Sequence, residues 1–184
     1  MTFTHQSLLF ARDQRFRSVV GKRLEAAVAS GRPAVLAVAP HRAALLLGSL
    51  PPQVTRSIEV MDRSTLYDAP GRMLAALHRT ALTHAPARVT VVAEPPPVRG
   101  PAPAAQEWQR LEAVLATALE ETALDLLCVH DTRGMAPGDL AAVHATHPVL
   151  VGEHGAVANH AYLGTAAHAQ RPAGPEPVSY THLT

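Results

Sequence analysis

Residues 88–93 read RVTVVA, and with the segments that follow they indicate the fold class of the whole chain. Their β-branched side chains predict a buried strand. Residues 94–103 are rich in proline, which offers no backbone donor, and predict a loop. Residues 104–122 then predict an amphipathic helix, and residues 125–129, DLLCV, predict a second buried strand. This succession is typical of two parallel strands joined by a crossover helix.

The same alternation extends in both directions from this unit. Repeated strand–helix pairs predict an α/β domain of three layers, in which helices cover both faces of a mostly parallel sheet. We assign a single domain to residues 1–165 and expect residues 166–184 to be a disordered or truncated C-terminal tail. Further helices are expected at 13–30, 41–50, 68–83 and 137–145, and further strands at 7–10, 34–39, 57–61 and 148–151.

Composition and charge exclude several classes of protein. The 184 residues are 47% hydrophobic and 17% charged, which predicts a globular chain. A net charge of +1 without a basic run argues against direct binding of nucleic acid. A single cysteine permits no internal disulfide and is typical of a reducing compartment. Because no signal peptide and no apolar run of about 20 residues is visible, we expect a cytoplasmic protein without a membrane span.

Motifs for cofactor or nucleophilic chemistry are missing from the sequence. Neither the phosphate loop G-x-x-x-x-G-K-[ST] nor the dinucleotide motif G-x-G-x-x-G occurs, so we expect no cofactor. The nucleophile motif G-x-S-x-G is absent too, and we expect no enzymatic activity. Eleven histidines are present, but only His144 and His147 share a helical spacing, and Pro148 ends that helix. Without a tight set of three ligands, the spacing predicts no metal site.

Two acidic residues directly follow predicted strands. Glu94 comes directly after the strand at 88–93, and Asp131 follows the strand at 125–129 after His130, so both are expected at the same rim of the sheet. Acids there either contact a ligand or hydrogen-bond the adjoining loops, and the sequence leaves both open. Cys128 lies within an apolar strand, where a thiol is more often an inert packing residue than part of a pocket. Trp108, the single tryptophan, either packs on the sheet or lines a pocket.

Several short segments keep a fixed order over residues 4–162. They are THQSLLF with His5, YDAP with Tyr67 and Pro70, AEP at 93–95, EWQRLEAVL with Trp108, Arg110 and Glu112, LLCVHDT with Cys128 and Asp131, and THPVL followed by N-x-x-Y with His147, Pro148, Asn159 and Tyr162. Together these segments resemble the MEDS family of sensory domains, named for methanogen, methylotroph and dichloromethane-regulator proteins. The chain departs from the family pattern at Ala93, Leu111, Val129 and His130.

The resemblance implies a Rossmann- or RecA-like core that senses small hydrocarbon-derived molecules inside the cell. It also implies a role in signal transduction or transcription regulation, through a histidine-kinase-like, anti-sigma-like or DNA-binding output domain in cis or in trans. We expect the ligand at the carboxyl rim of the sheet. The candidate ligand-binding residues are His5, Tyr67, Glu94, Trp108, Glu112, Cys128, His130, Asp131 and His147.

Two alternatives to a ligand-binding sensor stay open at this point. The acids and the histidine at the strand ends are also compatible with a small α/β enzyme that uses acid–base chemistry. A protein-interaction module with no ligand at all is the other alternative, and an exposed apolar patch with a filled rim would favour it.

Overall fold

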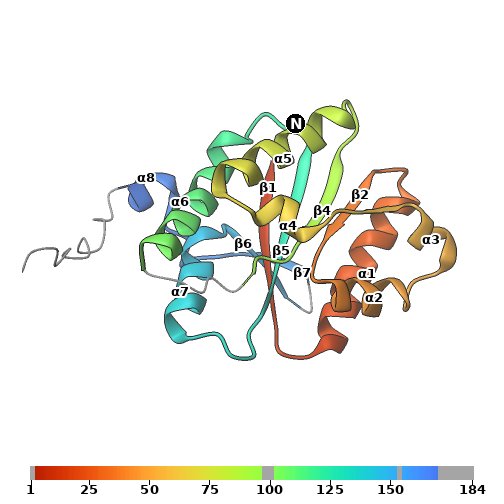
Figure 1. Cartoon of the computed structure of the whole chain (residues 1–184), viewed down its shortest axis with the longest axis horizontal. Coiled ribbons are helices and arrows are strands. Elements are labelled where there is room, and N and C mark those ends of the chain that lie inside the picture. The colour runs from red at the N-terminus through yellow and green to blue at the C-terminus, as the bar shows by residue number, and fades with distance from the viewer. Residues whose placement is uncertain (1–2, 97–101, 153–154, 170–184) are drawn as a thin grey trace, which may run out of the picture.

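A seven-stranded sheet forms the middle layer of the computed structural model, which describes residues 3–96, 102–152 and 155–169 (Figure 1). The strand order is β3-β2-β4-β5-β1-β6-β7, and every neighbouring pair is parallel except β6 with β7. The predicted class, a mostly parallel three-layer α/β domain, is therefore confirmed. The strands are β1 Thr4–Phe10, β2 Ala34–Ala37, β3 Ile58–Val60, β4 Val89–Ala93, β5 Leu124–Asp131, β6 Val149–Gly152 and β7 Gly155–Ala158.

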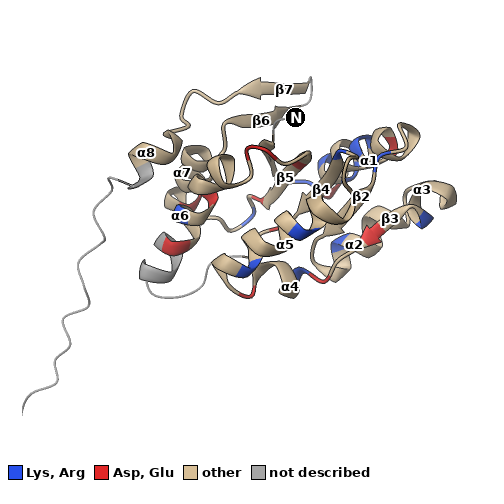
Figure 2. Ribbon diagram, turned by 90° about the horizontal axis from the view of Figure 1, so that it is seen from above, with Lys and Arg blue, Asp and Glu red and all other residues tan. Residues whose placement is uncertain are grey.

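Helices cover both faces of this sheet. One face packs against α1, α2 and α3, and the other packs against α4, α5 and α6, with α7 beside α6. Seen from above, α1 contains several basic residues, whereas strands β6 and β7 contain no charged residue (Figure 2). The helices are α1 Asp13–Ala29, α2 Pro40–Leu47, α3 Pro52–Arg56, α4 Arg63–Tyr67, α5 Pro70–Thr83, α6 Ala102–Ala118, α7 Pro137–Thr146 and α8 Gly164–Ala169.

The central strands β4 and β5 are buried on both faces, which explains their continuous apolar sequences. Successive side chains of a strand point to opposite faces. Val91 accordingly joins the core under α5 and α6, and Val92 joins the core under α1 and α2. Leu126 and Leu127 divide between the same two cores. The same alternation determines on which face of the sheet each functional residue lies.

Most expected elements are found, with shifted ends. The strand expected at 7–10 begins earlier, at Thr4, and the helix expected at 41–50 runs from Pro40 to Leu47. The predicted end of the loop at residue 103 is wrong, because α6 begins at Ala102, with a proline in its first turn. Residues 97–101 of that loop lie outside the described residues.

Four short elements were not predicted, namely α3, α4, β7 and α8. None of them is longer than six residues, and such lengths are too short to show a helical or strand periodicity. The predicted boundary between residues 165 and 166 falls inside α8, and residues 170–184 lie outside the described part of the chain. Among the described helices, none has the length and apolar character needed to cross a membrane.

Candidate functional site

The carboxyl ends of β4 and β5 carry functional side chains on both faces of the sheet. Along β5, Cys128 and His130 face the side of α6, whereas Asp131 faces the side of α1 and α2, because side chains alternate along a strand. β1 lies parallel beside β5, so that Leu9 pairs with His130 and Phe10 with Asp131. Two separate polar networks result, one on each face.

The first network is an arginine clamp, formed by Arg42 with Glu94 and Asp131. Arg42 Nε donates to Glu94 Oε1 at 2.8 Å, and a terminal nitrogen of the same guanidinium donates to Asp131 Oδ2. The second oxygen of Glu94 accepts from the backbone N–H of Ala39 at 2.8 Å. The guanidinium carbon lies 4.9 Å from the centre of the Phe10 ring, within the range of a cation–π contact. One buried arginine thus ties together the ends of β2, β4 and β5.

Arg133 and Asp13 continue the clamp toward the solvent. Arg133 Nε donates to Asp131 Oδ1 at 2.9 Å, and its terminal nitrogen donates to Asp13 at 2.7 Å. The hydrogen bonds from Arg133, reinforced by Arg42, hold the pKa of Asp131 well below its usual range. Asp131 is therefore a carboxylate with two cationic partners.

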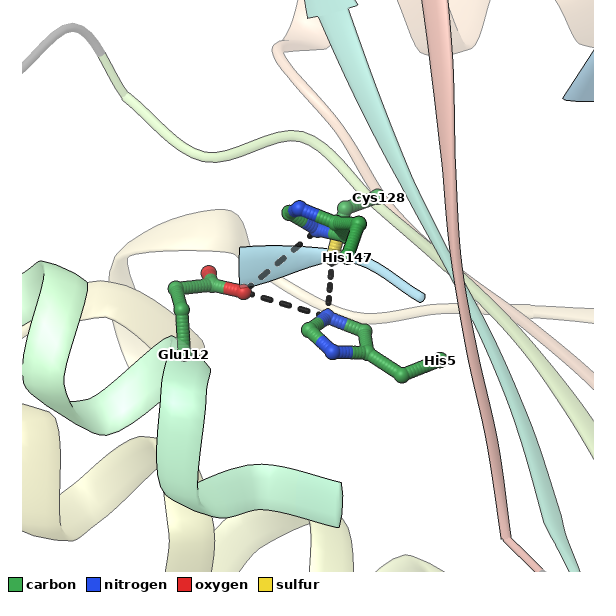
Figure 3. A group of neighbouring side chains, drawn as sticks. All are labelled: His5, Glu112, Cys128 and His147. Carbon is green, nitrogen blue, oxygen red and sulfur yellow. Dashed lines mark hydrogen bonds and ion pairs between the residues drawn. The ribbon is translucent and has the colours of Figure 1, made fainter. Parts of the chain in front are cut away.

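The second network is a buried cluster of His5, Glu112, Cys128 and His147, on the face covered by α6 (Figure 3). Glu112 Oε2 lies 3.1 Å from His5 Nε2 and 3.5 Å from His147 Nε2. His5 Nε2 lies 3.6 Å from Cys128 Sγ, in a hydrogen bond whose direction depends on the tautomer. The four residues come from β1, α6, β5 and the residue that follows α7. The fold therefore brings four distant segments to one point.

Burial shifts the ionisation of every member of this cluster. Desolvation lowers the pKa of both His5 and His147 to about 3, so both rings are neutral at physiological pH. Desolvation also raises the pKa of the Glu112 carboxyl and of the Cys128 thiol. The ring of His130 packs edge-on against His147, with centroids 5.4 Å apart, and burial lowers its pKa as well.

A cavity of about 440 Å³ opens above this cluster. It lies between α6, α7 and the carboxyl ends of β4 and β5, and the rings of Tyr67 and Trp108 form one wall, with centroids 5.7 Å apart. Its lining is Tyr67, Glu94, Pro95, Pro96, Trp108, Gln109, Glu112, His130, Asp131, Arg133, Gly134, Met135, Asp139, Ala142, Val143, Thr146 and His147.

Comparison with known proteins identifies the family of this chain. The family model described as the methanogen/methylotroph, DcmR sensory domain (MEDS) matches residues 4–148, which run from the first residue of β1 to the residue before β6. The chain belongs to the MEDS family. This membership gives it a sensory, regulatory role, and it confirms the resemblance seen in the sequence. A search of curated proteins finds no match.

The MEDS domain places most of the predicted site residues around the cavity. All of them line it except His5 and Cys128, which lie behind Glu112. His5 lies away from the rim of the sheet, because its partner in the parallel register is Leu126, well before the end of β5. Glu94 and Asp131 do meet at the rim as predicted, but Arg42 pairs with both carboxylates and Arg133 also pairs with Asp131.

Sequence reasoning missed the two arginines of the clamp. Arg42 follows the predicted strand at 34–39 and sits in the first turn of α2, a position where an arginine is ordinarily solvated. The only signal in the sequence is position. Arg42 follows one buried strand, and acids follow two other buried strands that end at the same rim. Arg133 follows Asp131 by two residues, and its backbone N–H also donates to that carboxylate at 2.9 Å.

Proposed function

We propose that this MEDS domain senses a small organic molecule, hydrocarbon-derived in its chemistry, that binds in the cavity beside α6 and α7. The cavity carries the proposal. Its volume of about 440 Å³ lies within the range of small-molecule sites, and its walls combine aromatic and aliphatic groups with a few polar ones.

Two buried polar atoms indicate what the ligand offers. The hydroxyl of Tyr67 and Nε2 of His130 have no hydrogen-bond partner among the described residues, and both residues line the cavity. Buried polar groups are rarely left unpaired, so a group from outside the chain is the natural partner. A compact molecule with an apolar body and one hydroxyl or carbonyl group fits both the Tyr67–Trp108 wall and these two atoms.

Binding without turnover fits the clamp better than an acid–base enzyme does. The acids that an enzyme of this type would use, Glu94 and Asp131, are already ion-paired with Arg42. The open cavity in turn favours a ligand-binding module over a pure interaction module. For the ligand to signal, it must bind one of two conformations more tightly, because equal affinity shifts no population. The output partner is a histidine-kinase-like, anti-sigma-like or DNA-binding domain, in cis or in trans.

A thermal-shift screen of short alcohols, aldehydes, ketones and halogenated alkanes tests the proposal. A compound at 100 times its Kd stabilises the folded state by about 2.7 kcal/mol. For a domain of this size that corresponds to a rise of about 5–10 °C in Tm. Trp108, the single tryptophan and part of the cavity wall, provides a second readout through its fluorescence.

Two neighbouring alanines of α7 provide a matched pair of variants. Ala142 lines the cavity, whereas Ala141 is exposed on the same helix. Ala142→Leu fills part of the cavity and is expected to abolish the ligand-induced rise in Tm, while Ala141→Leu retains it. The proposal fails if no compound of the panel stabilises the protein, or if the two variants respond equally to the compound that does.

A further inference from the structure

We propose that His5, Glu112, Cys128 and His147 bind a divalent transition-metal cation of the zinc type, with two imidazole nitrogens, one carboxylate oxygen and one thiolate sulfur as ligands. The sequence spacing predicted no metal site, because each ligand comes from a different segment of the chain. The proposal goes beyond the sensing of an organic ligand and does not depend on it.

The spacing of the ligand atoms carries the first step. In a tetrahedral zinc site with bonds of about 2.0–2.3 Å, neighbouring ligand atoms lie about 3.3–3.6 Å apart. The contacts of the cluster measure 3.1 Å and 3.5 Å from Glu112 Oε2 to the two ring nitrogens, and 3.6 Å from His5 Nε2 to Cys128 Sγ. The four ligand atoms all lie within 4.8 Å of one another. A tetrahedral site requires the remaining separations, which are at most 4.8 Å, to close to about 3.6 Å.

The orientation of His147 carries the second step. Its Nδ1 lies 2.9 Å from the carbonyl oxygen of Val143. A carbonyl only accepts hydrogen bonds, so Nδ1 carries the hydrogen and Nε2 of the neutral ring presents a lone pair. That nitrogen has no hydrogen-bond partner among the described residues and faces the carboxylate of Glu112. Metal-binding histidines are held in the same way, by a hydrogen bond from the ring nitrogen that does not bind the ion.

The backbone at His147 is held as firmly as the ring. The side-chain amide of Asn159 donates to the carbonyl oxygens of His144 at 2.6 Å and of His147 at 2.7 Å. These bonds anchor the end of α7 to the segment after β7. The imidazole of His147 is therefore presented to the cluster by a rigid support, as a metal ligand requires.

The third argument for the metal site concerns the charges around Glu112. Its ion-pair contacts in the described part of the chain are with His5 and His147, and no arginine or lysine is among them. Glu112 Oε2 and His147 Nε2 thus meet as two buried acceptors, which is unfavourable unless a cation or a proton lies between them. A divalent cation satisfies both acceptors at once and also binds the sulfur of Cys128 as a thiolate.

The donor set indicates which cation. Imidazole and thiolate ligands select zinc and related transition metals, whereas Mg²⁺ and Ca²⁺ prefer oxygen ligands alone. An entry path exists as well, because Glu112 and His147 line the cavity while His5 and Cys128 lie behind them. The cation would therefore form part of the inner wall of the cavity.

Titration of the chelator-stripped full chain with Co²⁺, in the absence of any organic compound, tests the site. Bound Co²⁺ in a tetrahedral site gives intense visible absorption, and a thiolate ligand adds a charge-transfer band in the near ultraviolet. Cys128 is the single cysteine of the chain, so this band in the wild-type protein reports that residue alone. We expect both signals at one ion per chain, and their loss when Zn²⁺ displaces Co²⁺.

Variants separate this site from the other histidines. Cys128→Ser removes the charge-transfer band, and Glu112→Gln and His147→Ala weaken Co²⁺ binding at least tenfold. His144→Ala, three residues before His147 on α7, leaves binding unchanged. Binding without the thiolate band in the wild type, or equal affinity in His144→Ala and His147→Ala, would mean surface histidines bind the ion and would overturn the proposal. A negative thermal-shift screen bears on the organic ligand and leaves this result unaffected.

Discussion

Replacing Arg42 by leucine is expected to be among the most damaging single changes to the domain. Arg42 is 6% exposed and Glu94 is 7% exposed, so their contact is an ion pair largely shielded from water. The leucine keeps an apolar side chain at this position, but it removes the guanidinium that contacts the Phe10 ring and joins Glu94 to Asp131. What remains is a buried carboxylate beside a second carboxylate, without the cation between them.

The expected loss in the free energy of unfolding depends on which partners each acid retains in the variant. Breaking a buried pair by removing one partner costs about 3–5 kcal/mol. Glu94 keeps the N–H of Ala39 and a distant contact with Arg63 at 3.9 Å, and Asp131 keeps Arg133. These remaining partners place the expected loss for Arg42→Leu at the lower end, about 3 kcal/mol. For a chain of this length, the fall in Tm is about 6–12 °C.

Urea unfolding followed by circular dichroism, in a double-mutant cycle with Glu94→Gln, measures this loss. Glu94→Gln alone is expected to cost about 1–2 kcal/mol, since a charged hydrogen bond is replaced by a neutral one. The double variant should lose at least about 1 kcal/mol less than the sum, because the two residues interact directly. Arg56→Leu, at an exposed arginine of α3, is the control and should change stability by less than about 0.5 kcal/mol. A loss below about 1 kcal/mol for Arg42→Leu, or additive losses in the cycle, would refute the clamp.

Three further predictions concern the core, the loss of stability at low pH and one turn. Leu115→Ala, at a side chain with no exposed surface, should lower the free energy of unfolding in urea by about 2–5 kcal/mol. A smaller loss would mean that neighbouring side chains move into the space left by the leucine. Hydrogen bonds from Arg133 hold the pKa of Asp131 below its unfolded value, so the stability that Asp131 contributes is complete above about pH 5 and is lost as the pH falls further. Asp131→Asn should therefore flatten the decline of the urea midpoint between about pH 5 and pH 2, and an unchanged decline would contradict this. Gly31 has φ +66°, and no atom lies within 4 Å of the position that an added Cβ would take. Gly31→Ala should therefore lower the free energy of unfolding by about 1 kcal/mol through backbone strain alone, whereas an increase in Tm would show that the turn relaxes.

The sequence predicts the fold well wherever burial determines the pattern. Residues 88–93 and 125–129 form strands because both faces of β4 and β5 are covered, and this leaves a continuous apolar run that needs no knowledge of the partner strands. The rim acids Glu94 and Asp131 are predictable for the same reason, since Glu94 comes directly after such a run and Asp131 follows one after His130. Short elements such as β7 depend instead on pairing with β6, and that pairing leaves no trace in a four-residue sequence of small side chains.

The buried cluster illustrates where the reasoning from spacing stops. His5 and Cys128 lie side by side because β1 and β5 are neighbours in the sheet, although β1 is the first strand and β5 the fifth. Strand order follows from the handedness and path of every crossover, which no local pattern encodes. Resemblance to the MEDS family marked His5, Glu112, Cys128 and His147 as members of one ordered set, but it did not show that they touch.

The two networks answer the same physical problem in different ways, and the contrast supports the metal site. On one face of the sheet, the buried Glu94 and the half-buried Asp131 are both paired with Arg42, and Asp131 is also paired with Arg133. On the other face, the described ion-pair partners of Glu112 are the imidazoles of His5 and His147, with no arginine or lysine among them. Oε2 of Glu112 therefore faces the lone pair of His147 Nε2, and neither atom has a hydrogen-bond partner among the described residues. The proposed cation would satisfy both atoms, at the wall of the cavity where a sensed molecule would bind.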